Sequence, residues 1–138
     1  MINEIKSYRV HRVGSETDVL SSEFTSTTWN AAETATLGNY MGVAPDHRPK
    51  VSVRMLYDHE YLYVSFLVED RYVVATAKRH QDSVCIDSCV EFFFTPGEIL
   101  EEGYFNIEVN CGGTVLLCHQ TDPAEHVTQI PNDMIIGM

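Results

Sequence analysis

Polar side chains that could grip a sugar recur at every second position in the second half of the sequence. Glu91 lies in one predicted strand, and the next predicted strand carries Tyr104, Asn106, Glu108 and Asn110. Alternate residues of a strand point to the same side, so all five could share one polar sheet face. Carboxylates and amides bind vicinal hydroxyls, while an aromatic ring covers the C–H surface of a sugar. The pattern therefore predicts a carbohydrate-binding face.

Other interpretations of the two carboxylates stay open. Glu91 and Glu108 could be solvated residues on an outer sheet face, or could pair with Arg54 or Arg71 across strands. They could also be a glycosidase pair, whose carboxyl groups lie roughly 5 to 9.5 Å apart. That separation is common on any acidic sheet, and the sequence contains no G-x-S-x-G, Walker or H-E-x-x-H motif. We therefore expect no enzyme, and glycoside processing is the least favoured alternative.

A polar segment at residues 72–86 could rim this face, because it links the two predicted hairpin regions. Arg71, Tyr72, Arg79 and His80 lie at its start and in its middle. The predicted sugar-binding set is Arg71, Tyr72, Arg79, Glu91, Asn106 and Glu108.

Calcium is the metal that the sequence favours. Asp70, Asp82 and Asp87 lie at predicted strand ends and in loops, where the oxygen ligands that calcium requires can converge. Solvated loop acids are the alternative interpretation. The six histidines show no spacing typical of zinc ligands.

The four cysteines are expected to be free and mostly buried. Cys85 and Cys89 in one extended segment would be about 13 Å apart, too far to share an ion or a bridge. In the predicted hairpin of residues 104–119, Cys118 lies opposite Ile107 and does not meet Cys111. The spacing therefore favours neither a disulfide framework nor a metal site.

Three antiparallel strands must position the polar face: residues 88–95, 104–111 and 114–119. Pro96 and Gly97 end the first strand, and Gly112 and Gly113 predict a two-residue turn after the second. In the second strand, the apolar residues that alternate with the polar ones are expected in the interior, and the polar ones in water.

A further hairpin is predicted at residues 51–68, with its turn at residues 58–60. Five or six strands, short turns and little helix predict an all-β fold, an antiparallel β-sandwich of immunoglobulin-like or jelly-roll type. At 138 residues the chain is expected to form a single domain, residues 1–138.

The composition disfavours several classes of partner. The net charge of −11 disfavours nucleic acid and anionic membranes, which attract clustered Lys and Arg. No apolar run approaches the roughly 20 residues of a membrane span. The first residues lack the apolar core of a secretory signal, so the location stays open between the cytoplasm and an extracellular module expressed without its leader.

Three segments resemble the family 9 carbohydrate-binding modules and their DOMON-type relatives. They are YDHEYLYVSFLVEDRYV at 57–73, DSCVEFFFTPG at 87–97 and GYFNIEVNCGGTVLL at 103–117. The resemblance implies a β-sandwich and a non-catalytic sugar-binding module of the kind attached to xylanases. In that family two tryptophans clamp a terminal sugar and bound calcium ions stiffen loops.

The sequence departs from this family in two ways. It stops before the family's C-terminal part, so the fold is expected to be incomplete there, and its unfinished edge predicts an alternative role in assembly as a homo-oligomer. No tryptophan follows Trp29, which matches an early family tryptophan and is expected to pack inside. Tyr72 is the aromatic residue nearest to the position where the resemblance places the other sugar-clamping residue.

Overall fold

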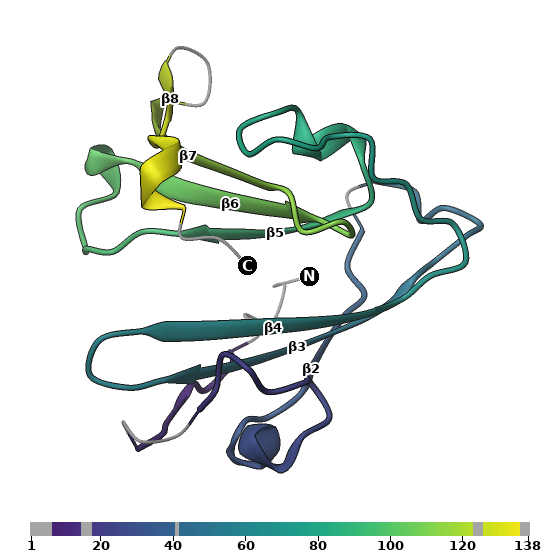
Figure 1. Cartoon of the computed structure of the whole chain (residues 1–138), viewed down its shortest axis with the longest axis vertical. Coiled ribbons are helices and arrows are strands. Elements are labelled where there is room, and N and C mark those ends of the chain that lie inside the picture. The colour runs from purple at the N-terminus through teal and green to yellow at the C-terminus, as the bar shows by residue number, and fades with distance from the viewer. Residues whose placement is uncertain (1–6, 15–17, 41, 123–125, 136–138) are drawn as a thin grey trace. The chain divides into compact units, whose positions relative to one another are not determined.

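The computed structural model describes residues 7–14, 18–40, 42–122 and 126–135. The chain divides into two compact units, Met1–Arg71 and Tyr72–Met138, and each contains a four-stranded sheet (Figure 1). The helices in these residues are 3-10 turns of five residues or fewer, and none has the length and apolar character that a membrane crossing requires. The predicted all-β class is confirmed, with the two sheets that a β-sandwich requires.

A long hairpin is the centre of the first unit. The elements are β1 (His11–Arg12), η1 (Thr27–Ala31), β2 (Ala35–Leu37), β3 (Lys50–Tyr57) and β4 (Leu62–Glu69). β3 pairs along its whole length with antiparallel β4, and over shorter stretches with antiparallel β2 and parallel β1. This pairing confirms the predicted hairpin at residues 51–68. The β-branched and aromatic residues of the hairpin suit a pleated surface.

A small apolar cluster holds this unit together. Its buried members are Val19, Trp29, Ala32 and Leu56. The indole Nε1 of Trp29 donates a hydrogen bond to the carbonyl oxygen of Ser22 at 3.3 Å. The predicted packing role of Trp29 is confirmed, because the ring is buried and its one polar atom has a partner.

The carboxylate of Asp58 closes the turn between β3 and β4. Its Oδ1 accepts hydrogen bonds from the backbone N–H groups of Glu60 and Tyr61, and its Oδ2 accepts one from the Tyr63 hydroxyl, all at 2.8 Å. The bonds from Glu60 and Tyr61 hold the pKa of Asp58 below its ordinary value of 3.8. The ionised carboxylate therefore stabilises the folded turn.

Asp58→Asn should make the melting temperature less dependent on pH in the acidic range. Because the folded-state pKa is lowered, the stabilisation is complete above the unfolded value near 3.8 and is lost as pH falls through the folded value. We expect the variant to melt several degrees lower at pH 7 and the difference to shrink toward pH 3. Thermal unfolding followed by circular dichroism measures it. The exposed neighbour Glu60→Gln should show no such pH-dependent difference.

The second unit carries a four-stranded antiparallel sheet in chain order. Its elements are η2 (Val84–Ile86), β5 (Cys89–Phe94), η3 (Leu100–Glu102), β6 (Tyr104–Asn110), β7 (Val115–Asp122), β8 (His126–Gln129) and η4 (Asn132–Met134). The strand order is β5-β6-β7-β8. The predicted meander is confirmed, and part of the C-terminal tail forms an edge strand, β8, which pairs with β7.

The turn between β6 and β7 differs from the prediction by one residue. Val109 lies opposite Val115, and residues 111–113 form a three-residue loop. The N–H of Gly113 donates to the carbonyl of Asn110 at 2.9 Å, and Gly113 has φ = 81° while Gly112 does not have a positive φ. This is a turn closed by a left-handed glycine, the common form of a three-residue hairpin loop. The two-residue turn was wrong, and Cys118 therefore lies opposite Asn106 rather than Ile107.

His80 and Gln81 cover the part of the β7 edge that β8 does not reach. Val115 donates its N–H to His80 Nδ1 at 3.1 Å and accepts the N–H of Gln81 at 2.9 Å. The Gln81 amide accepts the N–H of Leu117 at 3.0 Å and donates to its carbonyl at 3.2 Å and to the carbonyl of Ile130. Gln81 has φ = 71°, an unusual conformation for a residue with a side chain, and these bonds hold it there.

Candidate functional site

One face of the second unit's sheet gathers the predicted polar residues. In the strand register Cys89 lies opposite Asn110, Glu91 opposite Glu108 and Phe93 opposite Asn106. Cross-strand partners point to the same side of a sheet. The polar face is defined by Cys89, Glu91, Phe93, Tyr104, Asn106, Glu108 and Asn110. The prediction that Glu91 shares a face with the polar residues of β6 is confirmed.

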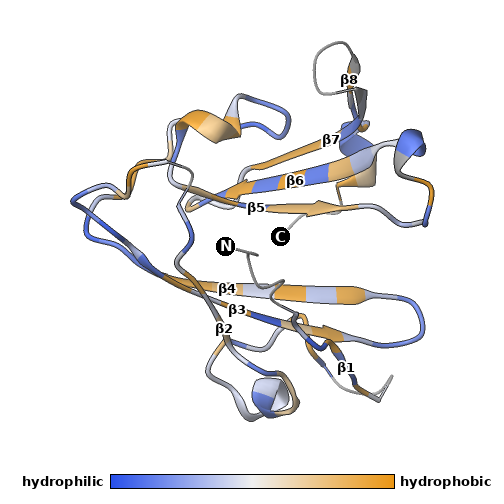
Figure 2. Ribbon diagram, turned by 180° about the vertical axis from the view of Figure 1, so that it is seen from behind, coloured by the Kyte–Doolittle hydropathy of each residue, from blue (hydrophilic) through white to orange (hydrophobic). Residues whose placement is uncertain are grey.

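The polar residues of β6 are buried, which the sequence did not predict. Asn106, Glu108 and Asn110 are only 5%, 7% and 3% exposed, whereas the apolar residues that alternate with them are half-buried. Figure 2 shows the hydrophilic residues along β6. β6 is a middle strand flanked by β5 and β7, and η2 packs against it. Neighbouring side chains therefore cover the row that was expected to face water.

Two buried oxygens in this row have no hydrogen-bond partner among the described residues. The Asn106 amide donates to Glu108 Oε1 at 2.8 Å, which satisfies one carboxylate oxygen. The remaining Asn106 Oδ1 and Glu108 Oε2 are inaccessible to water and unpartnered. A buried acceptor without a donor costs about 1–3 kcal/mol, so such atoms are uncommon in folded proteins. A hydrogen-bond donor or a positive charge beside either oxygen would offset this cost.

The charges on the face are of one sign. Burial, and then the charge of Glu91, raise the pKa of Glu108, while the hydrogen bond from Asn106 lowers it. Burial, Glu91 and Glu108 together raise the pKa of the Cys89 thiol to about 11. Neither Glu91 nor Glu108 forms an ion pair with any described residue. Arg54, one predicted partner, donates to Thr34 and Phe24 within the first unit.

Asp87 ties the segment before β5 to the β6–β7 turn. Its carboxylate accepts hydrogen bonds from Thr76 N, Thr76 Oγ1, Ala77 N and Asn110 Nδ2, at 2.6–2.9 Å. The bond from the Thr76 hydroxyl, followed by the one from its N–H, holds the pKa of Asp87 far below its ordinary value. Asn110 in turn accepts the N–H groups of Gly112 and Thr114. Asp87 therefore positions one end of the polar face.

The other two residues predicted to bind calcium also have protein partners. Asp70 Oδ1 lies 2.7 Å from His47 Nε2 in the first unit. Asp82 accepts the N–H of Arg79 at 3.1 Å and that of Lys78 at 3.4 Å in the second. Within the second unit, Asp82 and Asp87 hold different parts of the segment before β5. Calcium binding by Asp70, Asp82 and Asp87 stays a prediction.

The residues predicted to rim the site belong to other segments than the strands of the polar face. Arg71 is the last residue of the first unit. In the second unit, Tyr72 is 61% exposed and Arg79 approaches Asp82 at 3.4 Å. The structure thus brings together Glu91, Asn106 and Glu108 of the predicted set, and sugar binding by Arg71, Tyr72 and Arg79 stays a prediction.

Cys89 also lies on the polar face, although it was not among the predicted site residues. It is half-buried, and its Sγ lies 4.0 Å from Glu91 Oε1. All four cysteines are free as predicted, but Cys85 and Cys111 are exposed, so the expectation of mostly buried thiols was wrong. The signal was present in the sequence, because Cys89 and Glu91 are two residues apart in one strand and must share a face.

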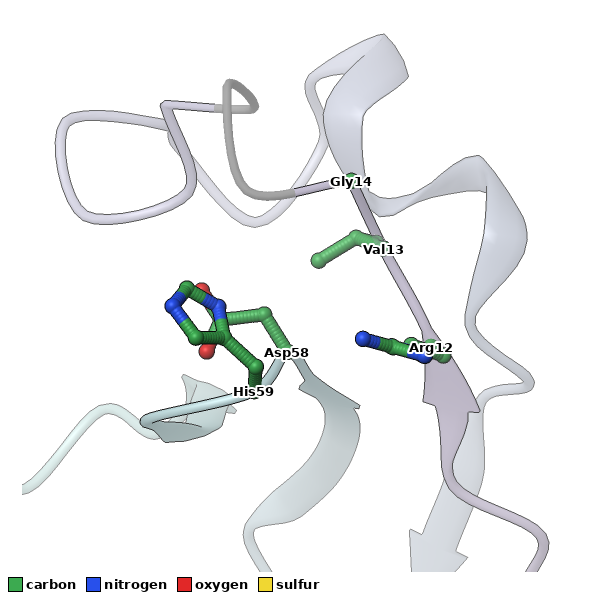
Figure 3. A pocket seen from close by; sticks show the side chains of 5 residues that line it. All are labelled: Arg12, Val13, Gly14, Asp58 and His59. Carbon is green, nitrogen blue, oxygen red and sulfur yellow. The ribbon is translucent and has the colours of Figure 1, made fainter.

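The first unit has an open cavity of about 530 Å³ near the β3–β4 turn. It is lined by Arg12, Val13, Gly14, Asp58 and His59 (Figure 3). The Asp58 carboxylate at its wall is already engaged by three donors of its own turn. None of the predicted sugar-binding residues lines this cavity.

The described residues form an all-β fold in which one sheet face gathers carboxylate, amide and thiol side chains. The chain belongs to carbohydrate-binding family 9, because the model of that family matches residues 27–136. The resemblance found in the sequence is thereby confirmed. Domains of this family are in general non-catalytic binding modules.

The fold is similar to a solved crystal structure. This is a protein from Bacteroides uniformis that is thought to bind carbohydrate, with 25% sequence identity and a TM-score of 0.68. The match covers 77% of this chain and 47% of that one, so this chain spans about half the length of the protein it matches. No curated protein matches the sequence.

Proposed function

We propose that the chain is a non-catalytic module that binds a mono- or oligosaccharide on the polar face, with Glu91, Asn106 and Glu108 at the centre. Membership of carbohydrate-binding family 9 supports the ligand class. The same three residues were predicted from the sequence; Glu91 lies directly opposite Glu108 on the adjacent strand, and Asn106 is two residues from Glu108 on the same face of β6.

The family match carries this proposal, together with the shared face of Glu91, Asn106 and Glu108; the oxygens Asn106 Oδ1 and Glu108 Oε2 are covered in the structure, so a sugar reaches them only after neighbouring side chains move aside. A sugar presents several hydroxyl donors on adjacent carbons, and two neighbouring acceptors suit such a pair. A hydrogen bond to a charged group contributes about 1.5–3 kcal/mol, so Glu108 should be the stronger of the two contacts. Binding would supply donors to acceptors that now have none.

An aromatic surface lies beside these acceptors. Phe93 is 53% exposed, and its ring centroid lies 5.9 Å from that of Tyr104. Both belong to the polar face, and the Tyr104 hydroxyl donates to Gln120 Oε1 at 2.8 Å. A ring held in this way can cover the C–H surface of a sugar while the acceptors bind its hydroxyls. Contributions from Arg71, Tyr72 and Arg79, and structural calcium, remain sequence predictions.

Glu108→Gln should weaken sugar binding at least tenfold, because the amide keeps the contact with Asn106 but removes the charged acceptor. Calorimetry with xylo-oligosaccharides, cello-oligosaccharides and monosaccharides measures this. Glu98→Gln, an exposed substitution outside the polar face, is the matched control and should bind like the unmodified chain.

Two results would contradict the proposal. One is the absence of binding to every sugar at millimolar concentration. The other is equal affinity of the Glu108 and Glu98 variants, which would place the sugar elsewhere on the chain.

A further inference from the structure

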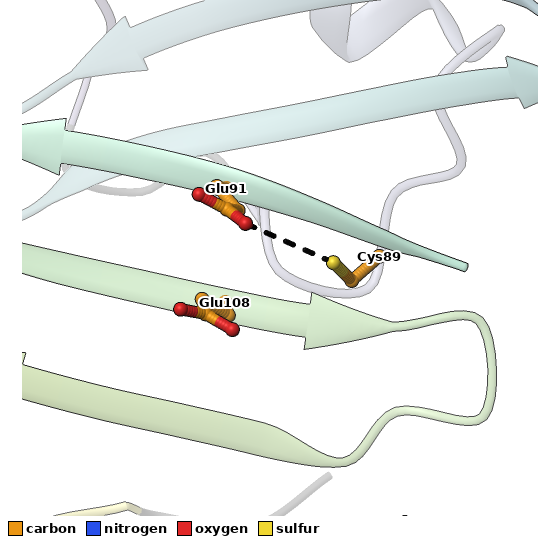
Figure 4. A group of neighbouring side chains, drawn as sticks. All are labelled: Cys89, Glu91 and Glu108. Atoms are coloured by element: carbon orange, nitrogen blue, oxygen red, sulfur yellow. Dashed lines mark hydrogen bonds between the residues drawn. The ribbon is translucent and has the colours of Figure 1, made fainter. Parts of the chain in front are cut away.

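Three side chains of metal-ligand type converge on the polar face. The Sγ of Cys89 and one carboxylate oxygen each of Glu91 and Glu108 all lie within 4.8 Å of one another. Figure 4 shows them on two neighbouring strands, with Cys89 and Glu91 on β5 and Glu108 on β6. No other group of three or more His, Cys, Asp or Glu side chains with this proximity occurs among the described residues.

The strand register produces this convergence. Cys89 and Glu91 are two residues apart on β5, so both project from the same side of the strand. Glu108 lies directly opposite Glu91, at the cross-strand distance of about 4.5–5.5 Å between Cβ atoms. The arrangement depends on ladder hydrogen bonds rather than on a loop, so the three ligands are held on a rigid element.

Glu108 gives an independent indication of a bound cation. Its side chain is more than nine-tenths buried, one oxygen is engaged by Asn106, and the other has no partner among the described residues. Glu91 lies opposite it with the same charge, and no described cationic side chain pairs with either carboxylate. A sugar hydroxyl could supply a donor here, whereas a cation would supply positive charge and also offset the repulsion between the two carboxylates, as a proton on Glu108 would.

The ligand set selects the class of metal. A thiolate with two carboxylates suits borderline-soft zinc, whereas calcium and magnesium take oxygen ligands. In a tetrahedral site with bonds of about 2.0–2.3 Å, ligand atoms lie roughly 3.3–3.8 Å apart. The present separations of up to 4.8 Å need to close by about 1 Å, which side-chain rotation can achieve. Glu91 is exposed, so the site is open to an entering ion.

We propose that Cys89, Glu91 and Glu108 bind one zinc-class divalent cation, with its fourth position open to water or another ligand. The site is separate from the calcium predicted at Asp70, Asp82 and Asp87. The metal proposal rests on the geometry of these three residues and does not depend on sugar binding. The metal site shares Glu91 and Glu108 with the proposed sugar site.

Cobalt, a coloured substitute for zinc, tests the proposal without any sugar. Co²⁺ is titrated into the reduced chain of residues 1–138, and the near-ultraviolet charge-transfer band of a cobalt–thiolate bond is recorded. We expect one equivalent to bind and stoichiometric Zn²⁺ to remove the band, while Ca²⁺ leaves it unchanged. Cys89→Ser should abolish the band. Cys85→Ser, Cys111→Ser and Cys118→Ser should retain it.

Glu91→Gln provides a second variant at an exposed position, where folding is not at issue, and should weaken Co²⁺ binding at least tenfold. The proposal is overturned by the absence of a thiolate band, by a band that survives Cys89→Ser, or by unchanged affinity in Glu91→Gln. Sugar titrations in the presence of a chelator are run in parallel. If the chain binds Co²⁺ but no sugar, the proposed function is wrong and the metal site stands. If it binds sugar but no Co²⁺, the metal site is wrong and the proposed function stands.

Discussion

Gly103→Ala should destabilise the chain strongly, because the added methyl group would meet backbone atoms. A Cβ at this position would lie 2.2 Å from the carbonyl oxygen of Gln120 and 2.9 Å from Thr121 Cα, both backbone atoms of β7. Neither can move without breaking the β6–β7 ladder, in which Tyr104 pairs with Gln120. Gly103 also has φ = +90°, which disfavours any side chain. We expect a loss of about 3 kcal/mol or more in the free energy of unfolding.

Substitutions at two other glycines separate the cost of backbone strain from the cost of the steric contact with β7. Gly113 has φ = +81° but open space around its Cβ position, so Gly113→Ala should cost only about 1 kcal/mol from backbone strain. Gly97, where the nearest atom is 4.0 Å away, should tolerate alanine with almost no change. Urea unfolding of the three variants measures the series. Equal losses at Gly103 and Gly113 would show that the contact with β7 is absent.

Asp87→Asn should produce the second large effect. The substitution replaces one acceptor oxygen by an NH₂ group, although the carboxylate receives hydrogen bonds from Thr76, Ala77 and Asn110. The NH₂ group would then face the two donors of Thr76 if it replaces Oδ1, or those of Ala77 and Asn110 if it replaces Oδ2. We expect the melting temperature to fall by about 5 °C or more at neutral pH.

Differential scanning calorimetry measures this loss, with the exposed Asp46→Asn as the control. A melting temperature within a degree of the unmodified chain would show that these hydrogen bonds contribute nothing to stability. If Asp87 acts only through its protein partners, added Ca²⁺ should not change the difference in melting temperature between the variant and the unmodified chain.

The faces of the strands could be predicted from the sequence, because a period of two depends only on local geometry. Glu91, Asn106 and Glu108 were correctly assigned to one side for this reason. Their burial could not be predicted, because it depends on β5, β7 and η2, which flank or pack against β6. Alternation indicates which residues share a side of a sheet, and tertiary packing decides which side is covered.

The register of the β6–β7 hairpin was missed for a different reason. Two consecutive glycines favour a two-residue turn, but the Asn110 side chain accepts the N–H groups of Gly112 and Thr114 and stabilises a longer loop. The role of Asp87 was also hidden, since its partners are 10 to 23 residues away in the chain. Side-chain contacts of this kind have no periodic signal in a sequence.

The capping of β7 by His80 and Gln81 bears on aggregation. A strand margin with free N–H and C=O groups is a template onto which a second molecule can add its own strand and begin to polymerise. At Val115 and Leu117 those groups are already occupied by a short segment of the same molecule. This stretch of the margin is therefore closed to intermolecular strand addition, without a further strand of its own.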